Sequence, residues 1–383
     1  MKNTTIALLF SLCLLAGCGQ KTEQGAIPVF DVASAIETPQ PFDLTEIAES
    51  VEFIALDSQT EALVGEIRTL EESKNGFYIH DGMETPVKFF DKTGKFHSTR
   101  GGIGRGPGEF NFLLGMAVDY ESDNVYLNTR SSTNVMRKYD SSGRQIAEAE
   151  TNLFSVSLEI VCYDGQLIVM NYPYVEPDAD GNVPLLYIFT SDLEPKDTLK
   201  IPHKATSDFI IRNSQILSNN GQELLIKEEL NDTLFYYRKQ ALVPAYTLDM
   251  GKYYFSEKIM WDLSMEQQWN NYYSINNLYE GSRYLFVMVK QGGGGYRGAL
   301  VFDKNEPSSG FTAADPKGRY GLLFVGGLKF TPMYIRDNQL VGYMQALDIV
   351  DNAEHITDPD LKALAATLTE DDNPVIVVAK LKE

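Results

Sequence analysis

Residues 76–94 read GFYIHDGMETPVKFFDKTG, and this stretch decides the fold of the chain. It contains an apolar run, a short polar loop, and a second apolar run that ends in an aromatic residue, an aspartate and a turn glycine. The same pattern returns in residues 124–143, which read NVYLNTRSSTNVMRKYDSSG. Short strands that recur with a period of roughly 20–50 residues predict stacked units rather than one conventional core.

The second apolar run of each unit carries an aromatic or apolar anchor along most of the chain. The first anchors recur about every 50 residues and are Phe90, Tyr139, Phe189 and Tyr236. Further strand pairs are predicted in 274–316 and 339–381, where wider spacing requires insertions. One insertion is expected at 252–280, and a helix is expected after Asp358, which has N-cap chemistry and is followed by a proline. Six four-stranded units without long helices between them predict an all-β, six-bladed β-propeller.

The two ends of the chain are expected to close this ring. An open ring would leave two unpaired sheet edges, which natural sheets avoid because such edges invite aggregation. Residues 51–56 alternate in polarity as a strand does and are placed to pair with residues 374–381. We therefore expect a propeller domain over 45–383, with an N-terminal strand completing its last blade.

The first residues have the form of a secretory signal. Lys2 supplies a positive charge, residues 6–15 form an apolar stretch too short to span a bilayer, and LAGC follows at 15–18. This ending resembles the lipobox of bacterial lipoproteins. The resemblance implies removal of residues 1–17, acylation of Cys18, and a tether over 18–44, and more than one acyl chain anchors a protein stably. An ordinary signal peptide with an incidental cysteine is the alternative.

The net charge argues against nucleic acid and anionic lipid as partners, and each of the three cysteines has an expected role. The formal net charge is −20, and an acidic surface repels nucleic acid phosphates and anionic headgroups, so we expect neither as a partner. Of the three cysteines, Cys13 leaves with the signal and Cys18 carries lipid. Cys162 is left alone on an apolar stretch, where a free thiol usually acts as a small hydrophobic core residue.

Several segments carry a resemblance to a known family. Residues 101–110, GGIGRGPGEF, together with GMAVD at 115–119, resemble an NHL-type propeller repeat. The whole chain resembles the six-bladed β-propeller lipoproteins of Bacteroidetes, through the lipobox, NDTLF at 231–235 and DNPVI at 372–376. The resemblance implies the fold and a cell-envelope location, and Gly19 after the lipobox favours the outer membrane. It supplies no catalytic residues.

The candidate binding residues lie at strand ends that share one face of a propeller. Inter-blade loops and the loops between second and third strands emerge on the same face, because successive strands alternate in direction. Polar groups that converge on a concave centre favour ligand binding, although each alone is also compatible with a solvated loop end. The candidates are His80, Asp81, Arg100, Arg105, Arg130, Tyr172 and Lys290.

No sequence motif assigns a cofactor or a reaction. The glycine-rich loop around Arg105 lacks dinucleotide and Walker A spacing, so we interpret it as a structural turn that presents an arginine able to bind a carboxylate or sulfate. No nucleophile elbow or zincin motif is present, and the histidines show no metal-ligand spacing. A metal site with ligands from separate blades is an alternative that the sequence leaves open. The carboxylate pair at 71–72 carries little information in so acidic a chain.

Two functions are compatible with this sequence. The first is a lipid-anchored, non-catalytic module at the cell envelope that binds a small molecule, glycan, peptide or protein. The second is an envelope lyase or hydrolase with its site in the central channel, which would require carboxylates, a histidine or a metal to converge there. Fold alone does not choose between them, because propellers host many functions.

Overall fold

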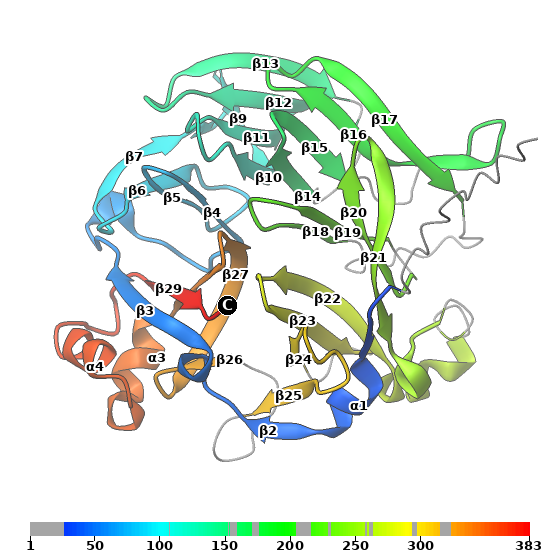
Figure 1. Cartoon of the computed structure of the whole chain (residues 1–383). Coiled ribbons are helices and arrows are strands. Elements are labelled where there is room, and N and C mark those ends of the chain that lie inside the picture. Colours follow the sequence, from blue (N-terminus) through cyan, green and yellow to red (C-terminus); the bar gives the residue numbers. More distant parts are fainter. Residues whose placement is uncertain are drawn as a thin grey trace, which may run out of the picture.

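The chain forms a ring of six β-sheets around a central axis, as Figure 1 shows. This computed structural model describes residues 27–106, 108–151, 153, 159–170, 176–203, 216–228, 231–256, 259, 263–292, 297–314 and 323–383. The prediction of an all-β, six-bladed β-propeller is confirmed.

Each blade is an antiparallel sheet that runs outward from the axis. Blade 1 contains β4 (Thr69–Ser73), β5 (Gly76–His80), β6 (Val87–Asp91) and β7 (Phe96–Arg100). Blade 2 contains β10 (Phe112–Val118), β11 (Val125–Arg130), β12 (Asn134–Tyr139) and β13 (Gln145–Thr151). Blade 3 contains β14 (Glu159–Tyr163), β15 (Gln166–Met170), β16 (Asn182–Thr190) and β17 (Pro195–Pro202).

The other three blades also take up strands from the beginning of the chain. Blade 4 contains β18 (Ile216–Asn219), β19 (Leu224–Lys227), β20 (Thr233–Arg238) and β21 (Ala241–Asp249). Blade 5 contains β22 (Tyr273–Glu280), β23 (Tyr284–Gln291), β24 (Arg297–Asp303) and β25 (Phe311–Ala314). Blade 6 contains β26 (Leu323–Val325), β27 (Leu328–Arg336), β28 (Gln339–Met344), β29 (Val375–Leu381) and β3 (Ala48–Ala55). A small parallel pair, β8 (Gly102–Ile103) and β9 (Glu109–Phe110), lies between blades 1 and 2.

Strand β3 closes the ring as its outermost strand in blade 6. It pairs antiparallel with β29, so that Ile54 lies opposite Ile376, and the predicted closure is confirmed. The seam continues into blade 1, where the Asp57 amide donates to the Gly94 carbonyl oxygen at 2.8 Å. Gly94 has a φ of +86°, and a Cβ there would lie 2.1 Å from the Ala55 carbonyl oxygen. The turn glycine of the repeat is therefore required at this seam.

Residues 27–44 form what we call the N-terminal strap. Strand β1 (Val29–Asp31) pairs in parallel with β21, and β2 (Pro39–Pro41) pairs in parallel with β25, with α1 (Val32–Glu37) between them. The strap thus follows the outer edges of blades 4 and 5, visible in blue in Figure 1. The sequence predicts a tether for these residues. They differ from a tether because Phe30 and Val32 are fully buried against the blades.

The hydrophobic core is divided among the interfaces between blades. Within the described residues, one apolar cluster fills each interface between neighbouring blades. All five residues of β5 are buried, because both faces of its sheet pack against neighbouring sheets. This accounts for the nearly continuous apolar runs in the sequence, which differ from the alternation of a strand with one solvated face.

The aspartate of the repeated motif builds the turn between the third and fourth strands. Asp91 Oδ1 accepts from the amides of Thr93 at 2.8 Å and Lys95 at 3.2 Å. Asp140 occupies the same place in blade 2 and accepts from the Ser142 amide at 3.0 Å. A carboxylate that binds turn amides in this way fixes the hairpin without needing contact with the core.

Helical segments occupy the insertions. The helix predicted after Asp358 is α4 (Pro359–Ala365), and Asp358 Oδ1 accepts from the Asp360 and Leu361 amides at 2.9 and 3.0 Å. Further helices in the described residues are α3 (Ala346–Asp351), η1 (Leu44–Glu46), η2 (Thr60–Ala62), η3 (Gly251–Tyr253), η4 (Leu263–Asn271) and η5 (Ala353–His355). None of the helices in the described part of the chain has the length and apolarity that crossing a membrane demands.

Candidate functional site

A cavity of about 730 Å³ occupies the centre of the ring. One strand of each of the six blades lines it, namely β4, β10, β14, β18, β22 and β27, and each of the first five is the innermost strand of its blade. Residues 66–68, which precede β4, and Met83, in the loop after β5, also line it. The cavity therefore extends toward the face formed by inter-blade segments and by the loops between second and third strands, which we call the inter-blade face. A cavity of this volume is of the size that small-molecule sites have.

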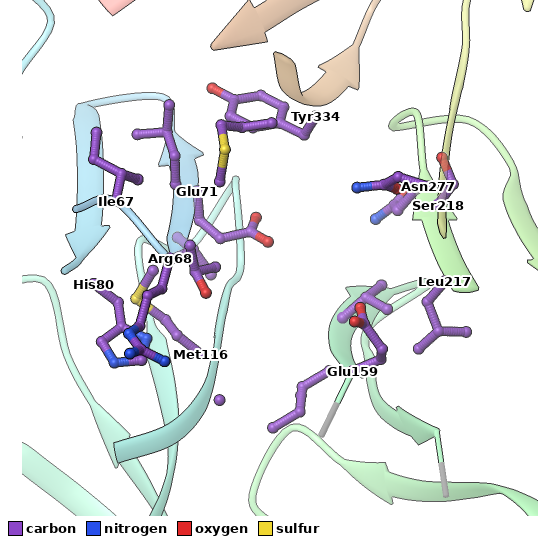
Figure 2. Close-up of a pocket in the computed structure, with 18 of the residues that line it drawn as sticks. Ile67, Arg68, Glu71, His80, Met116, Glu159, Leu217, Ser218, Asn277 and Tyr334 are labelled. Atoms are coloured by element: carbon purple, nitrogen blue, oxygen red, sulfur yellow. The ribbon is translucent and has the colours of Figure 1, made fainter. Parts of the chain in front are cut away.

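Two glutamates from different blades point into this cavity, as Figure 2 shows. The walls of the ring enclose Glu71 on β4, and this burial raises its pKa to about 8, with Arg336 opposing the shift and the charges of Glu72 and Glu159 adding to it. Glu159, at the start of β14, is accessible from the lumen but surrounded by protein, and burial raises its pKa to about 7. At neutral pH the cavity therefore holds carboxyl groups that can donate as well as accept hydrogen bonds.

Neutral polar groups face these glutamates from blades 4 and 5. Ser218 and Asn277 lie on the wall opposite Glu71 (Figure 2). The Ser218 hydroxyl donates to the Leu278 carbonyl oxygen at 2.8 Å. Asn277 donates to the Tyr279 hydroxyl at 2.9 Å. Tyr334 on β27 also lines the cavity, and burial, with the charges of Glu72 and Glu71 adding to it, keeps the pKa of this phenol well above its usual range.

His80 contributes a neutral imidazole to the cavity lining. Its Nε2 lies 3.0 Å from the Gly82 carbonyl oxygen, which assigns the proton to Nε2. Burial lowers the pKa of His80 to about 4, and the side chain is 4% exposed. Its Nδ1 finds no hydrogen-bond partner among the described residues. Of the candidate binding residues predicted from the sequence and described here, only His80 lines the cavity.

Polar contacts draw the blades together at the other end of the cavity. Arg336 lies at the end of β27, where its Nε is 3.9 Å from Glu72 Oε1 and its guanidinium lies 4.6 Å from the centre of the Tyr120 ring. The Asp337 amide donates to the Asn220 carbonyl oxygen at 3.0 Å, which joins the turns of blades 6 and 4. The arginine charge is therefore engaged by an anion and an aromatic ring.

Asp81 is engaged in the structure of blade 1. Its carboxylate accepts from Lys88 Nζ, the Gly65 amide and the Thr85 hydroxyl, each at 2.8 Å. Burial alone would raise the pKa of Asp81, but the Lys88 contact and the other hydrogen bonds outweigh it and hold the pKa below its ordinary value. This carboxylate fixes the loop that follows β5, next to His80.

Arg100 lies between blades 1 and 2 and is 1% exposed. Its guanidinium donates to the Ser98 hydroxyl at 2.7 Å and to the Ser141 carbonyl oxygen at 2.9 Å. It also lies over the rings of Tyr78 and Phe89, at 5.4 and 5.2 Å from their centres. The geometry gives Arg100 a structural role at this interface.

Three further candidates, Arg105, Arg130 and Lys290, are spread over the inter-blade face. Arg105 is exposed, in a loop that Glu109 folds by accepting from the Gly106 amide at 2.7 Å. Arg130 and Lys290 are partly buried at the ends of β11 and β23. Tyr172 and the lipidation candidate Cys18 lie outside the described residues. Ligand contacts of all these residues stay predictions.

Sequence reasoning missed both cavity glutamates. A pair such as Glu71–Glu72 carries little information in so acidic a sequence, and no motif marks Glu159. Their signal is positional, since each lies in the first strand of a repeat, which is the strand nearest the axis. Within the part of the chain that is described, no three His, Cys, Asp or Glu side chains converge as metal ligands.

The fold and its central cavity define a six-bladed propeller with a polar, ligand-sized centre. Residues 27–380 match the family model described as Domain of unknown function (DUF4934), and the chain belongs to this family. None of the curated proteins compared with it gives a significant match.

Two solved structures show the same fold. A Bacteroides fragilis protein described as exported is similar with a TM-score of 0.68 and 18% sequence identity, over 90% of this chain and 99% of that chain. A member of the DUF4221 family from Bacteroides vulgatus has a TM-score of 0.51 and 12% identity, over 87% of this chain and 96% of that chain. At these identities the likeness concerns the fold alone.

Proposed function

We propose that this chain is an extracytoplasmic binding protein that holds a small polar ligand, a glycan fragment or a short peptide, in its central cavity. The observation that carries the proposal is the cavity of about 730 Å³, to which all six blades contribute lining residues. A concave site with a few convergent polar groups on a mainly apolar scaffold is the usual form of a ligand site.

The cavity chemistry favours a ligand rich in hydrogen-bonding groups. With pKa values raised to about 8 and about 7, Glu71 and Glu159 carry protons near neutral pH and so donate hydrogen bonds to hydroxyl or carbonyl oxygens. Ser218 and Asn277 add neutral groups on the facing wall. A ligand that brings an ammonium group would instead favour the ionised carboxylates and would release protons on binding.

The proposed location is the cell envelope, through a lipid on Cys18 and with outer-membrane sorting. The signal-like residues 1–17 and the lipobox support it. The similar Bacteroides fragilis protein, described as exported, supports an extracytoplasmic location. Metabolic labelling with a palmitate analogue tests the anchor: label is expected on the wild type and lost in Cys18→Ala, and label that persists in that variant would overturn lipidation at this residue.

Ligand binding is tested with the chain lacking residues 1–18. Thermal-shift screening against defined oligosaccharides and short peptides identifies a ligand, which stabilises the native state in proportion to its affinity. Isothermal titration then compares the wild type with Glu71→Gln, Glu159→Gln and the exposed control Glu121→Gln. Affinity is expected to fall at least tenfold in either cavity variant and to stay unchanged in the control. Unchanged affinity in both cavity variants, or no ligand in the screen, would overturn the proposal.

A second candidate function is an envelope lyase or hydrolase. The observation that favours it is the presence of two carboxyl groups with raised pKa in one cavity, since acid–base catalysts are tuned in this way. Mass spectrometry of the bound ligand distinguishes the two functions. An enzyme converts the ligand and loses turnover in Glu71→Gln or Glu159→Gln, whereas a binding protein returns it unchanged. Elemental analysis for stoichiometric metal accompanies this assay.

A further inference from the structure

A second pocket lies away from the central cavity, over blade 5 on the inter-blade face. Its volume is about 420 Å³, and we call it the aromatic pocket. Its lining residues come from η3, η4 and the ends of β22 and β23, and they are Lys252, Tyr253, Asn270, Asn271, Tyr272, Tyr273 and Gln291. Among the described residues, none lines both this pocket and the central cavity. The strap helix α1 contacts η3 next to it, at the periphery of the ring in Figure 1.

Aromatic rings form a supported wall in this pocket. Tyr253 and Tyr273 meet edge to face with ring centres 5.4 Å apart. Tyr272 stacks on Phe255 at 6.0 Å and 11°, and Phe255 in turn meets Trp269 edge to face at 5.9 Å. All five rings are only partly buried. Each ring is held by another ring, so the exposed faces are presented in a fixed arrangement.

The N-terminal strap orients one of these rings and balances the nearby charge. Glu37, at the end of α1, accepts from the Tyr253 hydroxyl at 2.8 Å. The same carboxylate pairs with Lys252 Nζ at 2.5 Å, and the contacts with Lys252 and Tyr253 lower the pKa of Glu37. The lysine charge is thereby matched, and the other lining side chains that the structure describes are neutral.

Neutral amides complete the pocket. Asn270 and Asn271 are exposed at the end of η4, and Gln291 donates to the Asn270 carbonyl oxygen across the pocket. An amide side chain offers both donors and an acceptor, which matches the paired donor and acceptor character of a hydroxyl group. The pocket therefore places the apolar faces of tyrosine rings next to amides that can donate hydrogen bonds to a ligand hydroxyl and accept them from it.

We propose that the aromatic pocket is a carbohydrate subsite that takes one or two neutral hexopyranose units. The C–H face of a pyranose ring is weakly positive and packs on the negative face of an aromatic ring, while its hydroxyls pair with the amides. The absence of unmatched charge among the described lining residues, in a chain of net charge −20, argues for a neutral ligand over a cationic one. This subsite stands independently of the central cavity.

Saturation-transfer NMR on the chain lacking residues 1–18 tests the subsite with neutral trisaccharides of glucose, mannose, xylose and N-acetylglucosamine. Transfer to ring protons of at least one sugar is expected, with binding weakened at least tenfold by Tyr272→Ala and by Asn271→Ala. Tyr272→Phe keeps the ring and is expected to bind like the wild type. Circular dichroism confirms that each variant is folded.

The result also separates this subsite from the proposed function. Glu71→Gln lies in the central cavity and is expected to leave sugar binding at the aromatic pocket unchanged. No transfer to any of the sugars, equal binding by Tyr272→Ala and Asn271→Ala, or displacement by short peptides with no sugar signal would overturn the inference. A loss of binding in Glu71→Gln alone would place the sugar in the central cavity and overturn it as well.

Discussion

Glu71 of blade 1 and Glu159 of blade 3 direct their carboxyl groups into one cavity from the innermost strands of the ring (Figure 2). The negative charge on Glu159 is one of the causes that raise the pKa of Glu71, after burial and the charge of Glu72. The pKa of Glu159 is raised by burial alone, so the enclosing walls of the ring are the main cause of both raised values. The protonation states of Glu71 and Glu159 determine whether the cavity offers hydrogen-bond donors or negative charge to a ligand. These protonation states can be measured before the ligand is identified.

The free energy of unfolding is expected to fall as pH rises, because of Glu71. Its carboxyl has a pKa near 4.5 when unfolded and about 8 when folded, so the unfolded state loses its proton first and becomes favoured between these values. Glu71→Gln removes this titration. Relative to the wild type, the variant should gain about 2 kcal/mol between pH 5 and pH 9, less than the full shift implies because lumen water screens the charge.

Urea denaturation at pH 5, 7 and 9 measures this difference. The matched control is Glu121→Gln, an exposed substitution on the turn after β10, whose stability difference from the wild type should not vary with pH. A Glu71→Gln variant whose stability tracks the wild type across this range would show that the enclosed carboxyl ionises as freely as one in water.

Ile54→Ala is expected to weaken the seam that closes the ring. Ile54 lies opposite Ile376 on β29, is 7% exposed, and packs in the cluster between blades 6 and 1. Truncating a buried isoleucine leaves a cavity and should lower the free energy of unfolding by about 3 kcal/mol. Chemical denaturation measures it against Ile146→Ala, on the outer strand β13, where the 44% exposed side chain should change stability by less than about 0.5 kcal/mol. Equal effects would argue against β3 as the closing strand.

Arg100→Ala is expected to destabilise the fold by about 3 kcal/mol, because it leaves buried hydrogen-bond acceptors and two aromatic faces without a partner. Arg100→Lys should recover only a small part, since an ammonium cannot reproduce the planar donor fork. Arg105→Ala, at an exposed position, should be neutral in the same thermal or urea denaturation experiment. If Arg100→Ala were also neutral, the guanidinium would be free for a ligand.

Asp81→Asn is expected to destabilise the protein at neutral pH but not in acid. The lowered pKa of Asp81 means that its stabilising effect is present above the unfolded pKa, near 3.9, and is lost as pH falls through the folded pKa. At pH 7 the variant leaves Lys88 buried without its carboxylate, at a cost of about 3 kcal/mol. Denaturation from pH 7 to pH 2 should show the two curves converge.

The double variant Asp81→Asn/Lys88→Met provides the control for this prediction. Removing both charges leaves no ion without its partner, so much of the lost stability should return at pH 7. A double variant as unstable as the single one would instead assign the loss to the hydrogen bonds from Gly65 and Thr85.

The repeated strands made the architecture predictable from the sequence. The aromatic–Asp–turn–Gly motif marks one structural element, because Asp91 and Gly94 are both needed for the turn and the seam beside it. Closure by β3 followed from the need to pair two sheet edges. The strap was missed because its strands, at 29–31 and 39–41, are too short to show a period, and their pairing depends on edges that only the finished ring provides.

The site was less predictable, because side chains at strand ends look alike in a sequence. His80 and Asp81 are neighbours, yet His80 faces the cavity while Asp81 is tied to Lys88. Alternation along a strand can suggest such a difference, but which face meets the axis depends on the twist of the whole blade. For Arg100, burial between blades is a tertiary property that no local pattern reports.

The N-terminal strap limits how early the protein can complete its fold during synthesis. Val29 pairs with Thr247, Pro39 with Thr312 and Ala55 with Val375. The N-terminal strands can therefore pair only after strands much later in the sequence have been synthesised. Pairings between such distant segments form slowly. A partly synthesised chain can form the early blades, but the strands with which its N-terminal residues pair do not yet exist. The ring can close only after the last strand has been synthesised.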